Sequence, residues 1–193
     1  MSTIAIIPVK SFKAGNLRLS AALDDTGRLS LGRALATHVA STVVECGLTA
    51  LIVTGDPEVA AWAETAQFST ITDEGTGLND AVQQGVQWAS RTHSPWIAIH
   101  ADLPLLRPGD VAALIAANGD AIAPSSDGGT SAISTGRSIE FGYGPASFHR
   151  HLPQLHSPTV VARRGLLHDL DSPTDLDSVL SHPLGSWLGE HVR

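Results

Sequence analysis

Short apolar segments alternate with segments of helical periodicity, and this alternation limits the possible fold more than any other feature of the chain. Segments typical of buried strands are expected at residues 4–9, 50–53, 68–71, 96–99 and 121–123. Helices are expected between them at about 28–44, 57–66, 81–89 and 108–117. Such alternation predicts helices on both faces of a mainly parallel sheet. We therefore predict an α/β protein with a three-layer, Rossmann-like architecture, forming one domain over residues 1–193.

The alternation changes after Pro124. A turn-rich loop at 125–129 precedes a short strand at 131–134, which indicates a hairpin or an antiparallel extension of the sheet. A helix is then expected from about Ala146, a late strand at 159–162 and a final helix at 173–180. The predicted sheet is therefore mixed, although most of its strands are parallel.

Composition excludes several classes of function. The chain has 19 Asp and Glu against 12 Lys and Arg, a net charge of −7, which argues against non-specific nucleic-acid binding but allows a nucleotide as ligand. One cysteine allows neither an internal disulfide nor a multi-cysteine zinc site, and the nine histidines are scattered and expected at the surface. Without an apolar stretch of about 20 residues, we expect no membrane association and a cytoplasmic location.

The ends of the predicted strands carry polar residues that should share one edge of the sheet. Lys10, Thr54, Asp73 and Asp102 each follow a strand. Ligands of open α/β sheets bind beyond the carboxyl ends of the strands. This edge is therefore the predicted site.

Two acidic motifs indicate a cation there. Asp102 lies in the sequence 100–104, HADLP, and Asp169 and Asp171 lie in 169–173, DLDSP. Carboxylates near a strand end need partners, and a divalent cation with hard oxygen ligands would provide one. Helix capping is the alternative explanation for both motifs, since Asp or Ser before Pro often begins a helix.

Three further motifs are each ambiguous alone. Lys10, Lys13 and Arg18 form a basic group that could bind phosphates or be an ordinary solvated surface. The glycine-containing sequence of the turn at 77–79 occurs in many turns without a bound ligand. Ser147 lies in the first turn of a predicted helix, where free amide groups favour an anion.

The order of these motifs is more specific than any one of them. Over nearly its whole length the chain resembles the phospholactate and phosphoenolpyruvate guanylyltransferases of coenzyme F420 biosynthesis, which share the fold of MobA-like and sugar-nucleotide transferases. The resemblance rests on Ile7–Lys10, Arg18–Ser20, Gly77–Asn79, Ala101–Pro104, Gly129–Thr130, Tyr143–Ser147 and Asp169–Pro173, in that order.

The resemblance implies roles for individual residues. Those implied to hold Mg²⁺ are Asp102, Asp169 and Asp171. Those implied to bind the phosphorylated three-carbon acid are Thr130, Gly144 and Ser147. The guanine nucleotide would contact Pro8, Lys10, Lys13, Arg18, Gly77, Leu78 and Asn79. Lys10, Arg18 and Asp102 are the implied catalytic residues.

The resemblance also implies a reaction. The phosphate of the acid would attack the α-phosphorus of GTP and pyrophosphate would leave, which requires positioning and charge neutralisation rather than a protein nucleophile. A homodimer is left open. Asn16 stands where the family usually has a lysine. Two alternatives remain: transfer of CMP or another nucleotide to a pterin or sugar phosphate, and, because of Asn16, a non-catalytic nucleotide-binding relative.

Overall fold

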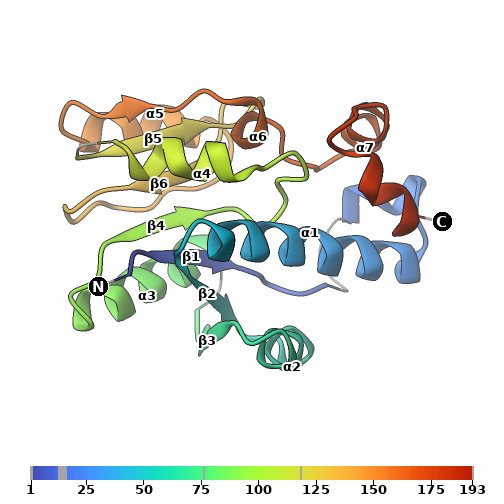
Figure 1. The fold of residues 1–193 in the computed structure, drawn as a ribbon, viewed down its shortest axis with the longest axis horizontal. Helices are drawn as coiled ribbons and strands as arrows, with labels where there is room; N and C mark the ends of the chain where they lie inside the picture. The colour runs from blue at the N-terminus through green and yellow to red at the C-terminus, as the bar shows by residue number, and fades with distance from the viewer. Residues whose placement is uncertain (1, 13–16, 76, 118, 193) are drawn as a thin grey trace.

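A seven-stranded mixed sheet forms the centre of the molecule (Figure 1). The computed structural model describes residues 2–12, 17–75, 77–117 and 119–192, so Lys13 and Asn16 lie outside the described residues. The strands are β1 (Ile4–Pro8), β2 (Thr49–Thr54), β3 (Ser69–Thr72), β4 (Trp96–Ile99), β5 (Ala121–Pro124), β6 (Thr130–Ser134) and β7 (Thr159–Val160). Their order is β3-β2-β1-β4-β6-β5-β7. Only β6, among these strands, runs antiparallel to its neighbours, β4 and β5.

Helices and 3₁₀ turns connect the strands. The α-helices are α1 (Asp25–Glu45), α2 (Pro57–Thr65), α3 (Leu78–Arg91), α4 (Pro108–Ile115), α5 (Ser147–His151), α6 (Arg164–Leu167) and α7 (Pro173–Leu180). The 3₁₀ helices are η1 (Leu17–Ala21), η2 (Leu152–Gln154) and η3 (Ser186–Glu190).

The side chains of β1 alternate between two apolar layers. Ala5 and Ile7 pack in the core that includes residues of α1, α2 and α4, whereas Ile4 and Ile6 pack in the core that includes residues of α3. Helix α3 approaches the sheet closely at Gly85, where an added Cβ would lie 2.3 Å from Cγ2 of Ile6. This is the predicted three-layer arrangement.

A third apolar cluster lies outside the two main layers and anchors the C-terminal region. Leu19 of η1, Leu35 of α1, Leu176 of α7 and Leu188 of η3 are all buried in it. Figure 1 shows α7 and the C-terminus beside the first turns of α1. The cluster thereby holds the residues that precede α7 near the carboxyl ends of the strands.

The structure confirms the predicted fold class and refines the elements. The predicted strand at 131–134 is β6, inserted between β4 and β5 as the antiparallel extension. The late strand covers only Thr159–Val160, whose two residue pairs with β5 are accompanied by hydrogen bonds from Thr159 to Asp120 and from Val161 to Ile122. Helix α6 and η1 were not predicted, since four or five residues are too few to show a period. Within the described ranges, no helix combines the length and apolar character needed to cross a bilayer.

Candidate active site

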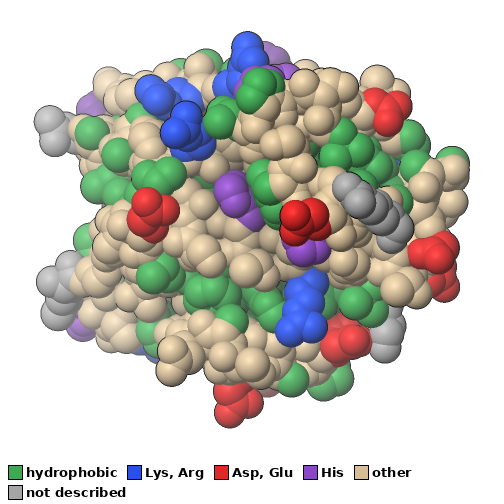
Figure 2. Space-filling view, turned by 45° about the vertical axis from the view of Figure 1, so that its right-hand side comes forward, with side chains coloured by type: hydrophobic (Ala, Val, Ile, Leu, Met, Phe, Trp, Pro, Cys, Tyr) green, Lys and Arg blue, Asp and Glu red, His purple; other side chains and the backbone are tan. Residues whose placement is uncertain are grey.

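Two adjoining cavities open at the carboxyl ends of the parallel strands. The central cavity, of about 420 Å³, is lined by the loop after β1, the loop after β4, the β5–β6 turn, residues 144–147 and residues 169–171. The flank cavity, of about 560 Å³, is lined by the ends of β1 and β2, the loop after β3 and the start of α3. Both cavities share Lys10 and Leu78. Figure 2 brings this side forward and shows acidic, basic and histidine side chains close together on a mostly uncharged face.

Most of the predicted site residues meet in these cavities. The central cavity is lined by Pro8, Lys10, Arg18, Leu78, Asp102, Thr130, Gly144, Ser147, Asp169 and Asp171. Gly77 lines the flank cavity, as does Asp73 from the predicted edge. Thr54 is instead buried, and its hydroxyl accepts a hydrogen bond from the amide of Asp56 at 3.1 Å.

Asn79 is placed differently from its prediction. It lines neither cavity, and its Oδ1 accepts a hydrogen bond from the amide of Tyr143 at 2.7 Å. Its side chain therefore ties the start of α3 to the loop that leads into α5.

A backbone hydrogen bond brings the two acidic motifs together across 68 residues of sequence. The amide of Leu170 donates to the carbonyl of Asp102 at 2.9 Å, and the Leu170 side chain is fully buried. Its neighbours Asp169 and Asp171 consequently lie beside the loop after β4 and line the same cavity.

Capping does not explain the acidic residues. Helix α7 is capped by Ser172, whose hydroxyl accepts from the amide of Asp175, while the Asp175 carboxylate accepts from the amide of Ser172 at 2.8 Å. Asp171 does not cap the helix, and its Oδ2 instead lies 3.1 Å from Nη1 of Arg18. The next helix after Asp102 does not begin until Pro108. The capping alternative is thus correct for Ser172 and Asp175 and wrong for Asp102 and Asp171.

The carboxylates shift one another's pKa. Oδ1 of Asp102 is buried and has no hydrogen-bond partner. Burial and the charges of Asp171 and Asp127 raise the pKa of Asp102 to about 7. Burial and the charge of Asp102 raise the pKa of Asp169 to about 6. By contrast, a hydrogen bond from the Ser125 hydroxyl lowers the pKa of Asp127. The cavity therefore carries excess negative charge that a cation would relieve.

The carboxylates of the central cavity fit Mg²⁺ only if a bound substrate supplies further oxygen ligands. Among the residues that the structure describes, no three His, Cys, Asp or Glu side chains are grouped so as to hold a metal by themselves. Mg²⁺, however, usually binds through one or two carboxylates together with substrate phosphates and waters. The partnerless oxygen of Asp102 and the raised pKa values agree with a site of that kind.

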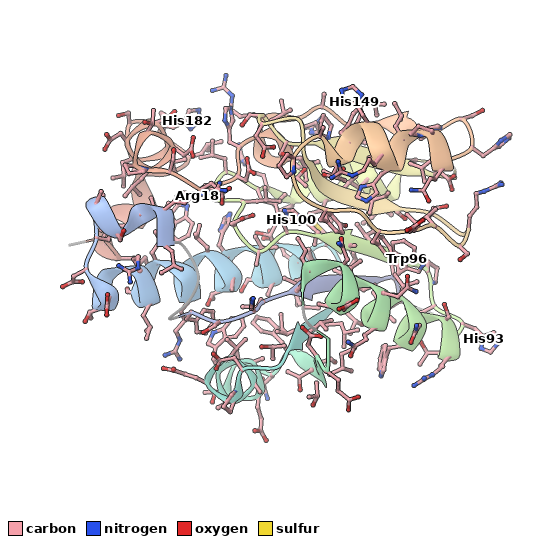
Figure 3. The ribbon with its side chains drawn as sticks, turned by 180° about the vertical axis from the view of Figure 1, so that it is seen from behind. Arg18, His93, Trp96, His100, His149 and His182 are labelled. Carbon is pink, nitrogen blue, oxygen red and sulfur yellow. The ribbon has the colours of Figure 1, made fainter. Side chains whose placement is uncertain are left out.

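Three residues of this region were missed by the sequence analysis. His100 and Asp127 line the central cavity, and Nδ1 of His100 lies 4.0 Å from Oδ1 of Asp102. His151 is completely buried, which contradicts the expectation that the histidines lie at the surface. Figure 3 shows His100 toward the middle of the molecule, whereas His93 and His149 lie at its outer edges.

The start of α5 is not the anion site that the sequence suggested. The amide of Ser147 donates to the carbonyl of Gly144 at 3.0 Å, and the amide of Phe148 donates to that of Gly128 at 3.3 Å. Gly144 has a φ of +114°, which permits the tight turn before the helix. Since these amides are engaged, the Ser147 hydroxyl is the group that this turn offers to the cavity.

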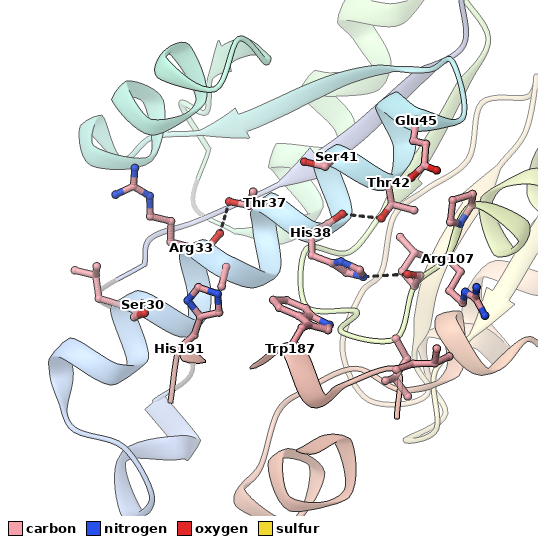
Figure 4. A pocket seen from close by; sticks show the side chains of 16 residues that line it. Ser30, Arg33, Thr37, His38, Ser41, Thr42, Glu45, Arg107, Trp187 and His191 are labelled. Carbon is pink, nitrogen blue, oxygen red and sulfur yellow. Dashed lines mark hydrogen bonds between the residues drawn. The ribbon is translucent and has the colours of Figure 1, made fainter. Parts of the chain in front are cut away.

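A larger cavity, of about 790 Å³, lies between α1, the loop before α4 and η3 (Figure 4). His38 bonds to the carbonyl of Leu106 through Nε2 at 2.9 Å and stacks on Trp187 with ring centroids 4.8 Å apart. No predicted site residue lines this cavity. It is separate from the site at the strand ends.

Comparisons with known proteins agree with this geometry. Residues 3–186 match the family described as "Guanylyl transferase CofC like". A phosphoenolpyruvate guanylyltransferase from Rubrobacter xylanophilus is 34% identical over 189 residues, which cover 91% of this chain and 92% of that protein. A 2-phospho-L-lactate guanylyltransferase from Methanothermobacter thermautotrophicus is 28% identical over 202 residues, covering 100% and 91%.

Solved structures support the fold. A structure from Desulfovibrio desulfuricans, assigned to the nucleotide-diphospho-sugar transferases, has a TM-score of 0.72 at 16% identity and covers 100% of this chain and 98% of its own. A nucleotidyl transferase from Methanothermobacter has a TM-score of 0.63 at 11% identity, with 93% and 96% covered. From the family match over nearly its whole length, the chain belongs to the CofC-like guanylyltransferases and is an enzyme of the nucleotidyltransferase type.

Proposed function

We propose that this protein transfers GMP from GTP to phosphoenolpyruvate or 2-phospho-L-lactate, with Mg²⁺, and releases pyrophosphate, as a step in coenzyme F420 biosynthesis. The observation that carries the proposal is the pair of cavities joined at Lys10, one of which holds carboxylates and hydroxyls side by side. The two acids are those in the names of the relatives from Rubrobacter and Methanothermobacter. The cytoplasmic location and the homodimer stay predictions.

The flank cavity suits the guanosine part of the nucleotide. Its wall includes the turn before α3, and an added Cβ at Gly77 would meet nothing within 4 Å. The exposed ammonium of Lys10 lies where the two cavities join. We assign this junction to the phosphates, because they connect the nucleoside to the reacting centre.

The central cavity suits the acid and the reacting phosphorus. Thr130 and Ser147 are almost fully buried, yet both line it, so their hydroxyls would contact oxygen atoms of the acid. Arg18 and Lys10 bring positive charge to its opening. Asp102, Asp169 and Asp171 would hold Mg²⁺.

The reaction requires positioning more than covalent help from the protein. A phosphate oxygen of the acid attacks the α-phosphorus, the bond from that phosphorus to the oxygen bridging to the β-phosphate breaks, and pyrophosphate leaves with the electron pair. Lys10 and Arg18 neutralise charge on the triphosphate, and the two hydroxyls orient the acid. When bound, Mg²⁺ supplies further charge neutralisation at the phosphates.

Pyrophosphate release tests this proposal. Purified protein is incubated with Mg²⁺, with GTP, CTP or ATP in turn, and with phosphoenolpyruvate, 2-phospho-L-lactate or 3-phosphoglycerate, and the product is identified by mass spectrometry. Release with GTP and one of the first two acids is expected. Release with CTP or ATP but not with GTP would favour an alternative transferase. Nucleotide binding without release under any condition would indicate a non-catalytic relative.

A further inference from the structure

His151 is buried behind the central cavity and makes hydrogen bonds through both ring nitrogens. Its side chain has no solvent exposure, and its ring contacts that of Tyr143 at a centroid distance of 5.0 Å. Nδ1 lies 3.0 Å from Oγ1 of Thr130. Nε2 accepts a hydrogen bond from the amide of Gly142 at 2.9 Å.

These contacts fix the tautomer of the ring. A backbone amide can only donate, so Nε2 must carry its lone pair toward Gly142. Burial and the charge of Arg150 lower the pKa of His151 to about 4, and the ring is therefore neutral near pH 7. The single ring proton is then on Nδ1, which donates to Thr130.

This donation restricts the hydroxyl of Thr130. Its oxygen accepts from His151 and lies 3.4 Å from Oγ of Ser147. If Ser147 donates to Thr130, both lone pairs of Thr130 are occupied and its hydrogen must be given to another acceptor. If Thr130 instead donates its hydroxyl hydrogen to Ser147, the hydroxyl hydrogen of Ser147 is the one that can be donated to another acceptor. In both cases the pair has one hydrogen to donate into the cavity that both residues line.

We propose that His151 is a positioning residue that makes the Thr130–Ser147 pair a hydrogen-bond donor toward an anionic oxygen of the acceptor acid. The inference rests on the proposed function, in which these hydroxyls contact the acid. The inference explains why this pair would select an anionic oxygen. Without the proton on His151, either hydroxyl could rotate and present a lone pair, which repels a carboxylate or phosphate oxygen. This fixed direction of donation favours an anion over a neutral group at this position.

The tautomer can be measured without any substrate. Long-range ¹H–¹⁵N spectra of the ¹⁵N-labelled full-length protein at neutral pH should show the His151 ring protonated at Nδ1, with the signal assigned by its loss in His151→Asn. A ring protonated at Nε2, or at both nitrogens, would overturn the inference. This measurement needs no folded variant other than the one used for assignment.

Kinetics test whether His151 acts through Thr130. His151→Phe should raise KM for the acid about tenfold, because a hydrogen bond to a charged group is among the stronger ones. KM for GTP should change less than about twofold, and His149→Phe, an exposed histidine on the same helix, is the matched control. His151→Asn, whose amide can donate near the Nδ1 position, should restore most of the loss.

A double-mutant cycle completes the test. In a Thr130→Val background, His151→Phe should add less than about a twofold change in KM for the acid, because the interaction is already absent. Additive effects would overturn the inference and leave the proposed function intact. Failure of the unmodified protein to turn over GTP with either acid would overturn the proposed function, and the inference with it.

Discussion

The central cavity and the flank cavity, which adjoin at the carboxyl ends of the strands, are built in different ways. The flank cavity lies over parallel strands β1, β2 and β3, and its residues come from short loops that each follow a strand directly. The central cavity lies at the ends of β1 and β4 and beside the antiparallel strand β6, and it collects residues from eight separate segments between Pro8 and Asp171. The flank cavity is formed by local loops, whereas the central cavity is assembled by long-range contacts and is lined by buried polar groups. We therefore expect substitutions in the centre to affect chemistry and those in the flank to affect nucleotide affinity.

The largest expected effect is in the centre. Asp102→Asn should lower kcat by at least about 1,000-fold, since it removes one metal-binding charge at the reacting centre, while circular dichroism stays unchanged. Asp177→Asn, an exposed carboxylate of α7, is the control. Full activity of Asp102→Asn at limiting Mg²⁺ would show that the metal assignment is wrong.

Lys10 should join the two cavities functionally, because it lines both. Lys10→Met should lower kcat/KM for GTP and for the acid by about 100-fold each, through loss of a charge that offsets the phosphates. Steady-state kinetics with each substrate varied in turn measures this. Arg91→Met, at the far end of α3, serves as the control, and an effect confined to one substrate would separate the cavities.

A flank variant sharpens the contrast. A Cβ at Gly75 would lie 2.2 Å from Cβ of Asp80, so Gly75→Ala should displace the turn before α3. KM for GTP should rise about tenfold, because overpacking shifts backbone that lines the nucleotide cavity, and KM for the acid should stay unchanged. Gly136→Ala, where an added Cβ meets nothing within 4 Å, is the control. An equal rise in KM for both substrates would contradict the assignment of the flank cavity to the nucleotide and of the central cavity to the acid.

The negative charge of the central cavity should also affect the thermal stability of the protein. The pKa of Asp102 is raised to about 7 in the folded protein, above its unfolded value, so its contribution is favourable at low pH and is lost as the pH rises toward 7. In metal-free buffer at about pH 8, Asp102→Asn should melt roughly 2–4 °C above the parent, and the excess should shrink at about pH 5.5. Mg²⁺ should raise the Tm of the parent but not of the variant. A Tm difference independent of pH would contradict this account.

The smallest effect is expected from the ion pair at the opening of the central cavity. Arg18 and Asp171 keep 78% and 46% of their side-chain exposure, so their pairing should contribute less than about 0.5 kcal/mol. Arg18→Gln should accordingly leave urea unfolding unchanged but raise KM for GTP, since Arg18 would bind phosphate in the complex. A loss of stability without a change in KM would make Arg18 structural.

The sequence predicted the flank well because its determinants are local. Lys10 and Asp73 follow strands whose β-branched composition is plain, and parallel strands end at one edge. Asp102 was found in the same way. Asp169 and Asp171 were grouped with Asp102 because all are carboxylates and because of the family resemblance, since the contact from Leu170 to Asp102 has no local sequence signal.

The buried polar groups of the centre were the least predictable. His151 is four residues after Ser147 and so lies on the same face of α5, but nothing in the sequence shows that β6 covers that face. Asp127 belongs to a turn-rich loop whose position depends on the antiparallel insertion of β6. The nucleotide contact of Asn79 stays a prediction, and the hydrogen bond from the amide of Tyr143 to its Oδ1 has no sequence signal. In each case a tertiary contact decided the role.

The hydrogen bond from Leu170 to Asp102 has a consequence for synthesis of the protein. A chain released by the ribosome after β7 would contain all seven strands of the sheet and Asp102, but neither Asp169 nor Asp171. Such a truncated product could build most of the scaffold while lacking two of the three carboxylates that we propose hold Mg²⁺. Premature termination or C-terminal proteolysis would then yield an inert scaffold rather than an enzyme with partial activity.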